Sequence, residues 1–211
     1  MTDASITAEK LLQAEAVKLS TNAPFTWASG WKSPIYCDNR KLLSLPFTRD
    51  YIKSELANAV FEKFPDADLI AGVATAGIAW GAMVADQLKL PFIYVRPKPK
   101  EHGLGNQIEG SYEVNQKIVI VEDLISTGKS SLQVAEVLRR ANVQVIGMVS
   151  IFNYLFDTAK ESFAASDVTL YSLTDYPALL NLAVAKSIIT IEQKEVLLNW
   201  RSDPANWTGV Y

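Results

Sequence analysis

Apolar and polar residues follow two different periodicities along this 211-residue chain. Short apolar runs rich in β-branched residues predict strands that are buried on both faces, and apolar residues three and four positions apart predict amphipathic helices. The strands are expected at residues 69–73, 92–95, 118–121 and 143–152. The helices are expected at residues 8–19, 48–63, 77–88, 129–141, 175–186 and 191–200, the last opened by a Thr190–Gln193 capping box. This alternation predicts an α/β fold with a mainly parallel sheet flanked by helices.

One long segment lacks apolar periodicity. Residues 97–112 contain two prolines and three glycines, so we expect a long loop there. Loops of this length in compact domains are often lids over functional sites. Ligands of parallel sheets bind beyond the carboxyl ends of the strands. We therefore expect this loop, residues 74–77 and residues 122–130 to meet at one cleft.

The composition is that of an ordinary globular protein, with 49% apolar residues, 20% charged residues and a net charge of −3. The mild acidity argues against a nucleic-acid partner, and no apolar stretch is long enough to cross a membrane. One cysteine and one histidine allow neither an internal disulfide nor a usual zinc site. We expect a single domain over residues 1–211, without a signal peptide and located in the cytoplasm.

Two adjacent acids, Glu122 and Asp123, follow the apolar run at residues 118–121, and a turn of small and hydroxyl residues comes after them. Carboxylates accept hydrogen bonds from sugar hydroxyls or hold a divalent cation. Turns of this kind, which open a helix, present N–H groups to a phosphate. The combination indicates a ribose phosphate, although an isolated acid pair could also cap the turn.

The triplet Gly128-Lys129-Ser130 suggests an alternative, the phosphate loop of nucleotide triphosphatases. That motif requires a glycine five residues before Gly128. The chain has Asp123 there, whose carboxylate would repel the phosphates. We therefore exclude this alternative.

Three motifs together resemble a known family. Residues 118–131 resemble the phosphoribosyl-pyrophosphate signature of the type I phosphoribosyltransferases. Residues 25–36 are similar to the N-terminal Ser-Gly-x-x-Ser-Pro stretch of the orotate phosphoribosyltransferases, and residues 96–103 are similar to their mobile catalytic loop. The resemblance covers roughly residues 7–160. It implies the type I phosphoribosyltransferase fold, with a core at about residues 45–165 and a small hood from about residues 1–44 and 166–211.

The resemblance also implies an activity. Members of this family transfer the phosphoribosyl group from 5-phosphoribosyl 1-diphosphate to orotate in de novo pyrimidine (UMP) biosynthesis, giving orotidine 5′-phosphate and diphosphate. They use Mg²⁺, held mainly by substrate and water, and act as homodimers that share the catalytic loop. Two alternatives stay open: a phosphoribosyltransferase for another base, and a regulatory protein of the same fold that senses phosphoribosyl pyrophosphate.

Site residues are carried over where the motifs match. The catalytic candidates are Lys100, His102, Arg96 and Asp123. The candidates for binding phosphoribosyl pyrophosphate are Arg96, Lys100, His102, Thr75, Glu122, Asp123, Leu124, Ile125, Ser126, Thr127, Gly128, Lys129 and Ser130. The candidates for binding orotate are Ser126, Tyr36 and Lys32. A solvated charge run is the alternative interpretation of the cations at residues 96–102.

The chain lacks a cation at three positions where many or some members of the family have one. Pro97 follows Arg96 where many members have lysine, which leaves Lys98 as an alternative source of charge. Ala28 precedes the Ser-Gly pair where many members have lysine. An arginine that some members carry near the end of the last core strand has no counterpart at residues 152–156.

Overall fold

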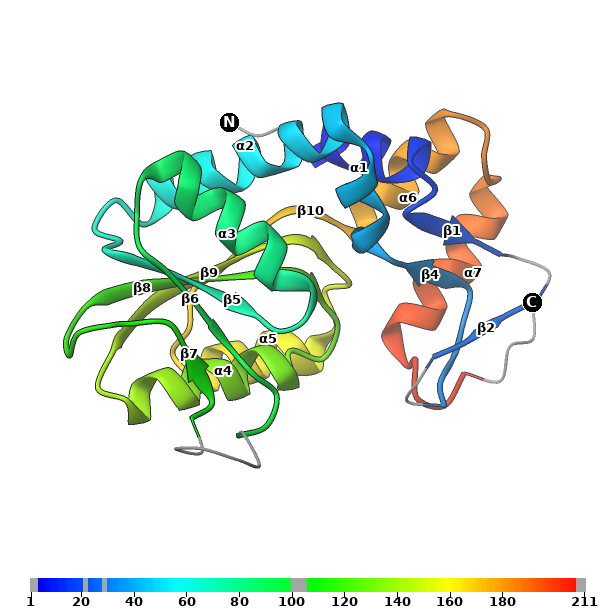
Figure 1. The fold of residues 1–211 in the computed structure, drawn as a ribbon. Helices are drawn as coiled ribbons and strands as arrows, with labels where there is room; N and C mark the ends of the chain where they lie inside the picture. The colour runs from blue at the N-terminus through cyan, green and yellow to red at the C-terminus, as the bar shows by residue number, and fades with distance from the viewer. Residues whose placement is uncertain (1–3, 21–22, 28–29, 100–105, 208–211) are drawn as a thin grey trace. The chain divides into compact units, whose positions relative to one another are not determined.

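The computed structural model describes residues 4–20, 23–27, 30–99 and 106–207. The contacts divide the chain into two compact units (Figure 1). One unit is formed by Asp50–Leu173. The other combines the segment that ends at Arg49 with the segment that begins at Thr174. Described segments from both the N-terminal and the C-terminal parts of the chain therefore form one unit, and the middle of the chain forms the other.

The main sheet has six strands among the described residues, in the order β10-β9-β8-β5-β6-β7. Strand β5 pairs in parallel with β6 and β8, β8 pairs in parallel with β9, and β7 runs antiparallel to β6. The expected α/β fold with a mainly parallel sheet is therefore confirmed. The strands are β5 (Leu69–Val73), β6 (Phe92–Val95), β7 (Ile108–Glu109), β8 (Lys117–Ile125), β9 (Gln144–Asn153) and β10 (Leu170–Asp175).

Helices cover both faces of this sheet, as apolar strands require. Helix α3 (Ala76–Leu88) lies on one face, and α4 (Lys129–Arg140) and α5 (Asp157–Ala165) lie on the other (Figure 1). Helix α2 (Pro46–Lys63) leads into the sheet and buries Ile52, Leu56 and Val60. None of the helices in the described parts of the chain is both long and apolar enough to span a bilayer.

The second unit is held together by an aromatic cluster. Trp200 is fully buried, and its indole Nε1 donates to the carbonyl oxygen of Lys32 at 3.0 Å. Its ring meets the rings of Trp27 and Tyr176 edge-on, with centroids 5.7 and 5.6 Å away. The elements of this unit are α1 (Ala4–Gln13), β1 (Val17–Leu19), β2 (Phe25–Thr26), β3 (Lys32–Ser33), β4 (Ile35–Cys37), the 3-10 helix η1 (Asn39–Ser44), α6 (Tyr176–Ala185) and α7 (Ile191–Ser202).

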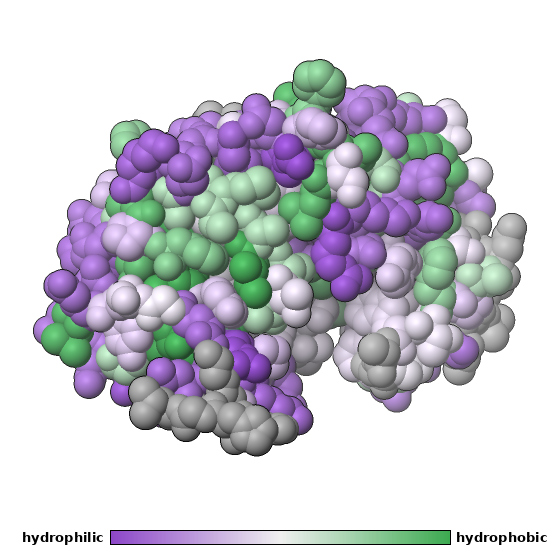
Figure 2. Space-filling model, in the orientation of Figure 1, coloured by the Kyte–Doolittle hydropathy of each residue, from purple (hydrophilic) through white to green (hydrophobic). Residues whose placement is uncertain are grey.

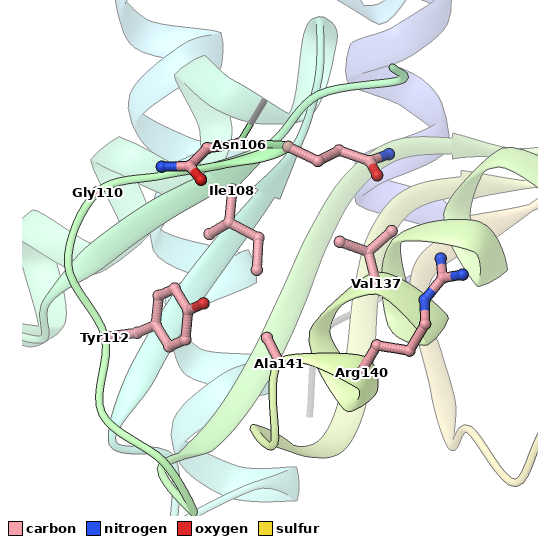
Figure 3. Close-up of a pocket in the computed structure, with 8 residues that line it drawn as sticks. Asn106, Ile108, Gly110, Tyr112, Val137, Arg140 and Ala141 are labelled. Atoms are coloured by element: carbon pink, nitrogen blue, oxygen red, sulfur yellow. The ribbon is translucent and has the colours of Figure 1, made fainter. Parts of the chain in front are cut away.

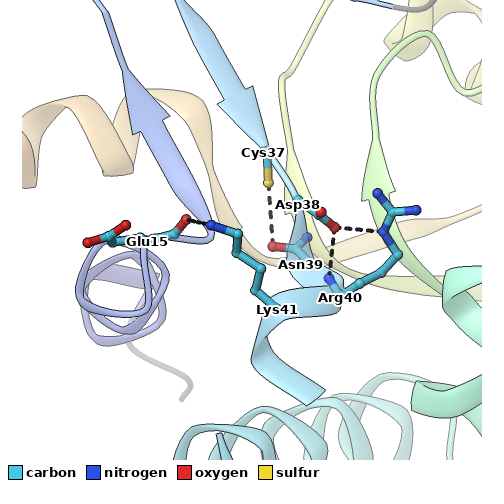
Figure 4. Close-up of polar contacts among 6 residues, drawn as sticks. All are labelled: Glu15, Cys37, Asp38, Asn39, Arg40 and Lys41. Carbon is cyan, nitrogen blue, oxygen red and sulfur yellow. Dashed lines mark hydrogen bonds and ion pairs between the residues drawn. The ribbon is translucent and has the colours of Figure 1, made fainter. Parts of the chain in front are cut away.

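The helix expected at residues 8–19 was placed wrongly. Helix α1 ends at Gln13, Glu15 adopts a left-handed conformation with φ of 49°, and the chain continues as β1. Strand β1 pairs antiparallel with β4, and Lys41 Nζ donates to the Glu15 carbonyl oxygen at 3.1 Å (Figure 4). These partners are distant in sequence, so local periodicity did not reveal them.

An ion pair lies at the start of η1, directly after β4. Arg40 Nε lies 2.6 Å from Asp38 Oδ1, and this hydrogen bond lowers the pKa of Asp38 below its usual value (Figure 4). Because the Arg40 side chain is largely exposed, the pair contributes little to stability.

Two further expectations required correction. The strand expected at residues 118–121 extends to Ile125, because β9 continues the ladder as far as Asn153. The acid pair therefore lies within a strand and not after it. The loop expected at residues 97–112 contains β7, whose residues Ile108 and Glu109 pair with β6. Strand β10 and helix α5 were not expected from the sequence.

Candidate functional site

The chain reverses its direction of winding between β5 and β8. From β5 it passes through α3 to β6 on one side, and from β8 it passes through α4 to β9 on the other side. Loops at such a switch point diverge and leave a crevice at the carboxyl ends of the strands. The structure thus brings together the loops at residues 74–75 and 126–128. The candidate Arg96 follows β6, the next strand along.

Two glycines allow the start of α3 to approach the sheet closely. A Cβ on Gly77 would lie 2.5 Å from the carbonyl oxygen of Val121, and a Cβ on Gly72 would lie 2.7 Å from the carbonyl oxygen of Gly77. The Ala74–Thr75 peptide bond is cis. Thr75 is exposed at the N-cap of α3 and makes no side-chain capping hydrogen bond. The positive end of this helix dipole therefore lies at the crevice.

A third glycine shapes the start of α4. Gly128 has φ of 76°, and a Cβ there would lie 2.6 Å from Cε2 of Phe163. Helix α4 has no side-chain cap and no acidic residue in its first turn. Its first N–H groups have no acceptor within the helix, which suits an anion. Ser126 and Thr127 are half-buried at this turn, and Lys129 and Ser130 are exposed.

The acid pair is asymmetric. Successive side chains of a strand point to opposite faces, so Glu122 and Asp123 diverge. Glu122 is only 6% exposed and is turned toward α4, where Ser131 Oγ donates to its Oε2 at 3.1 Å. The backbone N–H of Asp123 donates to Oε1 of Glu122 at 2.9 Å. Asp123 itself is half-buried. The Glu122 carboxylate therefore faces α4, and Asp123 lies on the opposite face of the strand.

The environment of Glu122 opposes its ionisation. Burial raises the pKa of this carboxyl well above its usual value, and the negative charge of Asp123 raises it further. The hydrogen bond from Ser131 acts in the opposite direction. Sequence reasoning did not single out Ser131. Its place on the buried side of the first turn of α4 was the available signal.

Hydrogen bonds between Arg96 and Gln107 join the two ends of the loop that follows β6. The Arg96 N–H donates to the Gln107 carbonyl oxygen at 2.9 Å, and Gln107 Nε2 donates to the Arg96 carbonyl oxygen at 2.9 Å. Arg96 Nη1 also lies 3.5 Å from Glu109 Oε1. Lys98 is exposed. The candidates Lys100 and His102 lie outside the described residues.

Two of the orotate candidates belong to the second unit. Tyr36 is partly exposed and packs on Phe25, with ring centroids 5.8 Å apart. Lys32 is exposed, and its Nζ donates to Thr26 Oγ1 at 2.8 Å. Ser126, the third candidate, lies in the first unit at the crevice.

A cavity of about 430 Å³ lies away from these residues (Figure 3). It borders the far end of α4, about 18 Å along the helix from its N-terminus at a rise of about 1.5 Å per residue. Its lining includes Gln107, Ile108, Tyr112, Val137 and Arg140, and none of the candidate site residues that the structure describes. In the described part of the chain, no group of three or more His, Cys, Asp or Glu residues could hold a metal ion.

Comparisons with known proteins agree with this geometry. A family model described as "Phosphoribosyl transferase domain" matches residues 50–175. Orotate phosphoribosyltransferase from Phocaeicola vulgatus is 54% identical over 200 residues, covering 95% of this chain and 94% of the relative. Orotate phosphoribosyltransferase from Porphyromonas gingivalis is 51% identical, covering 95% of both chains. The chain belongs to the orotate phosphoribosyltransferase family.

Solved structures of similar proteins support the same assignment. Orotate phosphoribosyltransferase from Aeropyrum pernix superposes with a TM-score of 0.71 at 29% identity, covering 83% of this chain and 97% of that chain. UMP synthase from Leishmania donovani superposes with a TM-score of 0.78 at 26% identity, covering 94% of this chain and 42% of that chain. The expected type I phosphoribosyltransferase fold is therefore confirmed.

Proposed function

We propose that this protein transfers the phosphoribosyl group of 5-phosphoribosyl 1-diphosphate to orotate, releasing diphosphate and forming orotidine 5′-phosphate for pyrimidine synthesis. The observation that carries this conclusion is the match, over almost the whole chain, to relatives named orotate phosphoribosyltransferase. The crevice between β5 and β8 supports it, because acids and an uncapped helix start lie side by side there.

The turn at residues 126–130 would bind the 5-phosphate of the ribose. The N–H groups at the start of α4 would donate to the phosphate oxygens, together with the hydroxyls of Ser126 and Thr127. The positive φ of Gly128 keeps the backbone of this turn close to α5. Lys129 adds a positive charge at the same helix end.

Asp123 and Glu122 would accept hydrogen bonds from the ribose hydroxyls. The reaction passes through a state in which the bond to diphosphate has loosened and positive charge develops on the sugar ring. Carboxylates fixed near that charge stabilise it, and such prearranged electrostatic groups usually supply a large part of catalysis. The ring nitrogen of orotate then bonds to the anomeric carbon as the diphosphate departs.

The diphosphate would lie between the start of α3 and the loop that follows β6. Thr75 and the first N–H groups of α3 would contact its oxygens. Arg96 would exchange the long contact with Glu109 for a shorter one with the diphosphate. Lys100 and His102 complete the set of donors in this proposal. Closure of such a loop would also exclude water.

The reaction would use Mg²⁺. The carboxylate and hydroxyl oxygens of Asp123, Ser126 and Thr127 are hard donors of the kind that Mg²⁺ accepts, so the residues fit this ion. It would be held mainly by oxygens of the substrate and by water. When bound, it reduces the repulsion among the phosphate oxygens.

We also propose a cytoplasmic homodimer in which one subunit's loop completes the neighbour's site. Figure 2 shows apolar side chains gathered over the outer face of α3. Ile78, Ala79, Ala82 and Met83 are at least partly accessible there, and Asp86 is the only charged residue of this helix. Apolar patches of this kind are typical of subunit interfaces.

A mixture of inactive Lys100→Ala and inactive Asp123→Asn subunits should regain part of the wild-type activity. A mixture without activity would contradict the shared loop.

The decisive experiment is a spectrophotometric assay of orotate consumption with phosphoribosyl pyrophosphate and Mg²⁺, repeated without each of them. We expect consumption only when both are present. Activity with adenine, guanine or uracil in place of orotate would support a different base, and binding without turnover would support a sensory role.

The Lys100→Ala variant should lose most of its turnover, about 100-fold or more for an electrostatic donor, with little change in Tm.

A further inference from the structure

The cavity at the far end of α4 combines an apolar surface with polar groups on either side of it. Its volume of about 430 Å³ lies within the range of small-molecule sites, which is about 300–1,000 Å³. The side chains of Ile108, Val137 and Ala141 lie between Tyr112 on one side and Arg140 on the other (Figure 3). The cavity therefore offers an aromatic ring and a guanidinium to the same ligand.

Arg140 supplies the positive charge of this cavity. The structure shows no hydrogen bond or ion pair between Arg140 and any other described residue. The preceding residue is engaged, because Arg139 donates to the carbonyl oxygens of Ser166 and Asp167 at 2.6 and 2.8 Å. None of the described residues that line the cavity is acidic. A guanidinium binds the oxygens of a phosphate in pairs, so this side of the cavity suits a phosphate group.

The other side of the cavity suits a flat ring with polar edges. Tyrosine rings stack on nucleobases. Asn106 and Gln107 also line the cavity, and each carboxamide has a donor end and an acceptor end that can pair with the edge of a base. Among the described residues, none donates to Oε1 of Gln107. A phosphate and a base with polar edges occur together in a nucleoside monophosphate.

Gln107 connects this cavity to the candidate functional site. Its Nε2 donates to the Arg96 carbonyl oxygen, and the Arg96 N–H donates to the Gln107 carbonyl oxygen, each at 2.9 Å. Glu109, whose Oε1 lies 3.5 Å from Arg96 Nη1, stands between Ile108 and Gly110, which both line the cavity. A ligand stabilises the arrangement to which it binds. A ligand in the cavity therefore favours the contact between Arg96 and Glu109.

We propose that this cavity is a second binding site, which takes a nucleoside monophosphate with its phosphate on Arg140 and its base beside Tyr112. Occupancy of this site weakens the binding of phosphoribosyl pyrophosphate, because Arg96 must leave Glu109 to reach the diphosphate. This second part rests on the proposed function, whereas the binding of the nucleotide does not. The coupling is reciprocal, so phosphoribosyl pyrophosphate weakens nucleotide binding by the same factor.

Calorimetric titration of the protein with AMP, GMP, CMP and UMP, each in turn, tests the site. We expect at least one of them to bind, and Arg140→Ala to raise its Kd by at least about tenfold, because a charge-assisted contact is lost. Lys160→Ala is the control. It removes an exposed cation of α5 that does not line the cavity, and it should leave Kd within about twofold, since exposed charges at a distance are screened.

Inorganic phosphate is the control for the ligand. If phosphate binds as tightly as the nucleotide, the cavity holds an anion without a base, and the inference is wrong. Failure of all four nucleotides to bind would also overturn it. A nucleotide that binds Arg140→Ala as tightly as the wild-type protein lies elsewhere, for example in the crevice, and contradicts the inference as well.

Assays of orotate consumption test the coupling. The nucleotide should raise KM for phosphoribosyl pyrophosphate in the wild-type protein, and Arg140→Ala should keep the basal KM and lose this effect. Nucleotide binding at the cavity without any change in KM would refute the coupling. Absence of orotate turnover, with nucleotide binding that still depends on Arg140, would instead refute the proposed function alone.

Discussion

At the scale of single residues, the buried carboxyl of Glu122 is the feature most at odds with stability. It accepts hydrogen bonds from Ser131 and from the Asp123 N–H, yet burial and the neighbouring charge still raise its pKa. Buried charges are retained mainly where function requires them. The carboxyl that is proposed to bind the ribose therefore also lowers the free energy of unfolding.

Glu122→Gln should stabilise the protein at neutral pH and reduce its activity. Glutamine keeps the shape, accepting from the Asp123 N–H and donating to Ser131, without a buried charge. The unfolded chain releases its proton near the usual pKa, and the folded protein retains it to higher pH. Wild-type stability therefore falls as pH rises from the usual pKa of glutamate through the raised one. We expect Glu122→Gln to be about 1–2 kcal/mol more stable at pH 8.

Thermal melts of both proteins between about pH 3 and 8, a range that begins more than one pH unit below the usual pKa of glutamate, measure this difference. The two Tm values should converge at the acidic end, where wild-type Glu122 is protonated in both states. A constant difference across this range would show that the ionisation of Glu122 is not its cause.

At the scale of elements, the start of α4 depends on one backbone conformation. Gly128 combines a positive φ with contact to the Phe163 ring of α5. Gly30 offers a comparison, because its φ of 88° is also positive and no atom of the described residues lies within 4 Å of the position of its Cβ. Alanine substitutions at the two glycines therefore distinguish the cost of backbone strain from the cost of steric contact.

Gly128→Ala should destabilise the protein more than Gly30→Ala does. Strain alone costs about 1–2 kcal/mol at a left-handed position, and overpacking against Phe163 adds about 1–3 kcal/mol. Urea unfolding measures the free energy of unfolding of both variants. Calorimetric titration with phosphoribosyl pyrophosphate should show weaker binding only for Gly128→Ala. Equal losses of stability would mean that Phe163 moves aside at no cost.

At the scale of the whole molecule, two units are built from interleaved parts of one chain. The family model covers residues 50–175, which nearly coincide with the central unit formed by Asp50–Leu173. All the candidates for binding the phosphoribosyl group belong to that span. The central unit also carries the apolar outer face of α3, on which the proposed dimer depends (Figure 2).

Ala82→Glu should dissociate the dimer, because it places a charge in this apolar face. Sedimentation should show the monomer, and activity should fall with it if the loop is shared. Ala164→Glu makes the same change at an exposed position of α5, on the opposite face of the sheet, and should remain dimeric and active. A dimeric Ala82→Glu protein would place the interface elsewhere.

The sequence by itself determined the elements whose pattern is local. The apolar runs of β5 and β6 and the periodicity of α3, α4 and α6 set their bounds within about one residue, and the Thr190–Gln193 capping box opens α7 as expected. The motifs around Glu122, Asp123 and Gly128 identified the family for the same reason, because their chemistry lies within a few consecutive residues.

Only the tertiary structure decided the features that depend on distant partners. Pairing with β4 ended α1 early, and pairing with β9 drew the acid pair into β8. The strand then turned Glu122 toward Ser131. The direction in which a side chain points depends on the ladder that holds its strand. That ladder forms between segments far apart in the chain, so no local pattern encodes it.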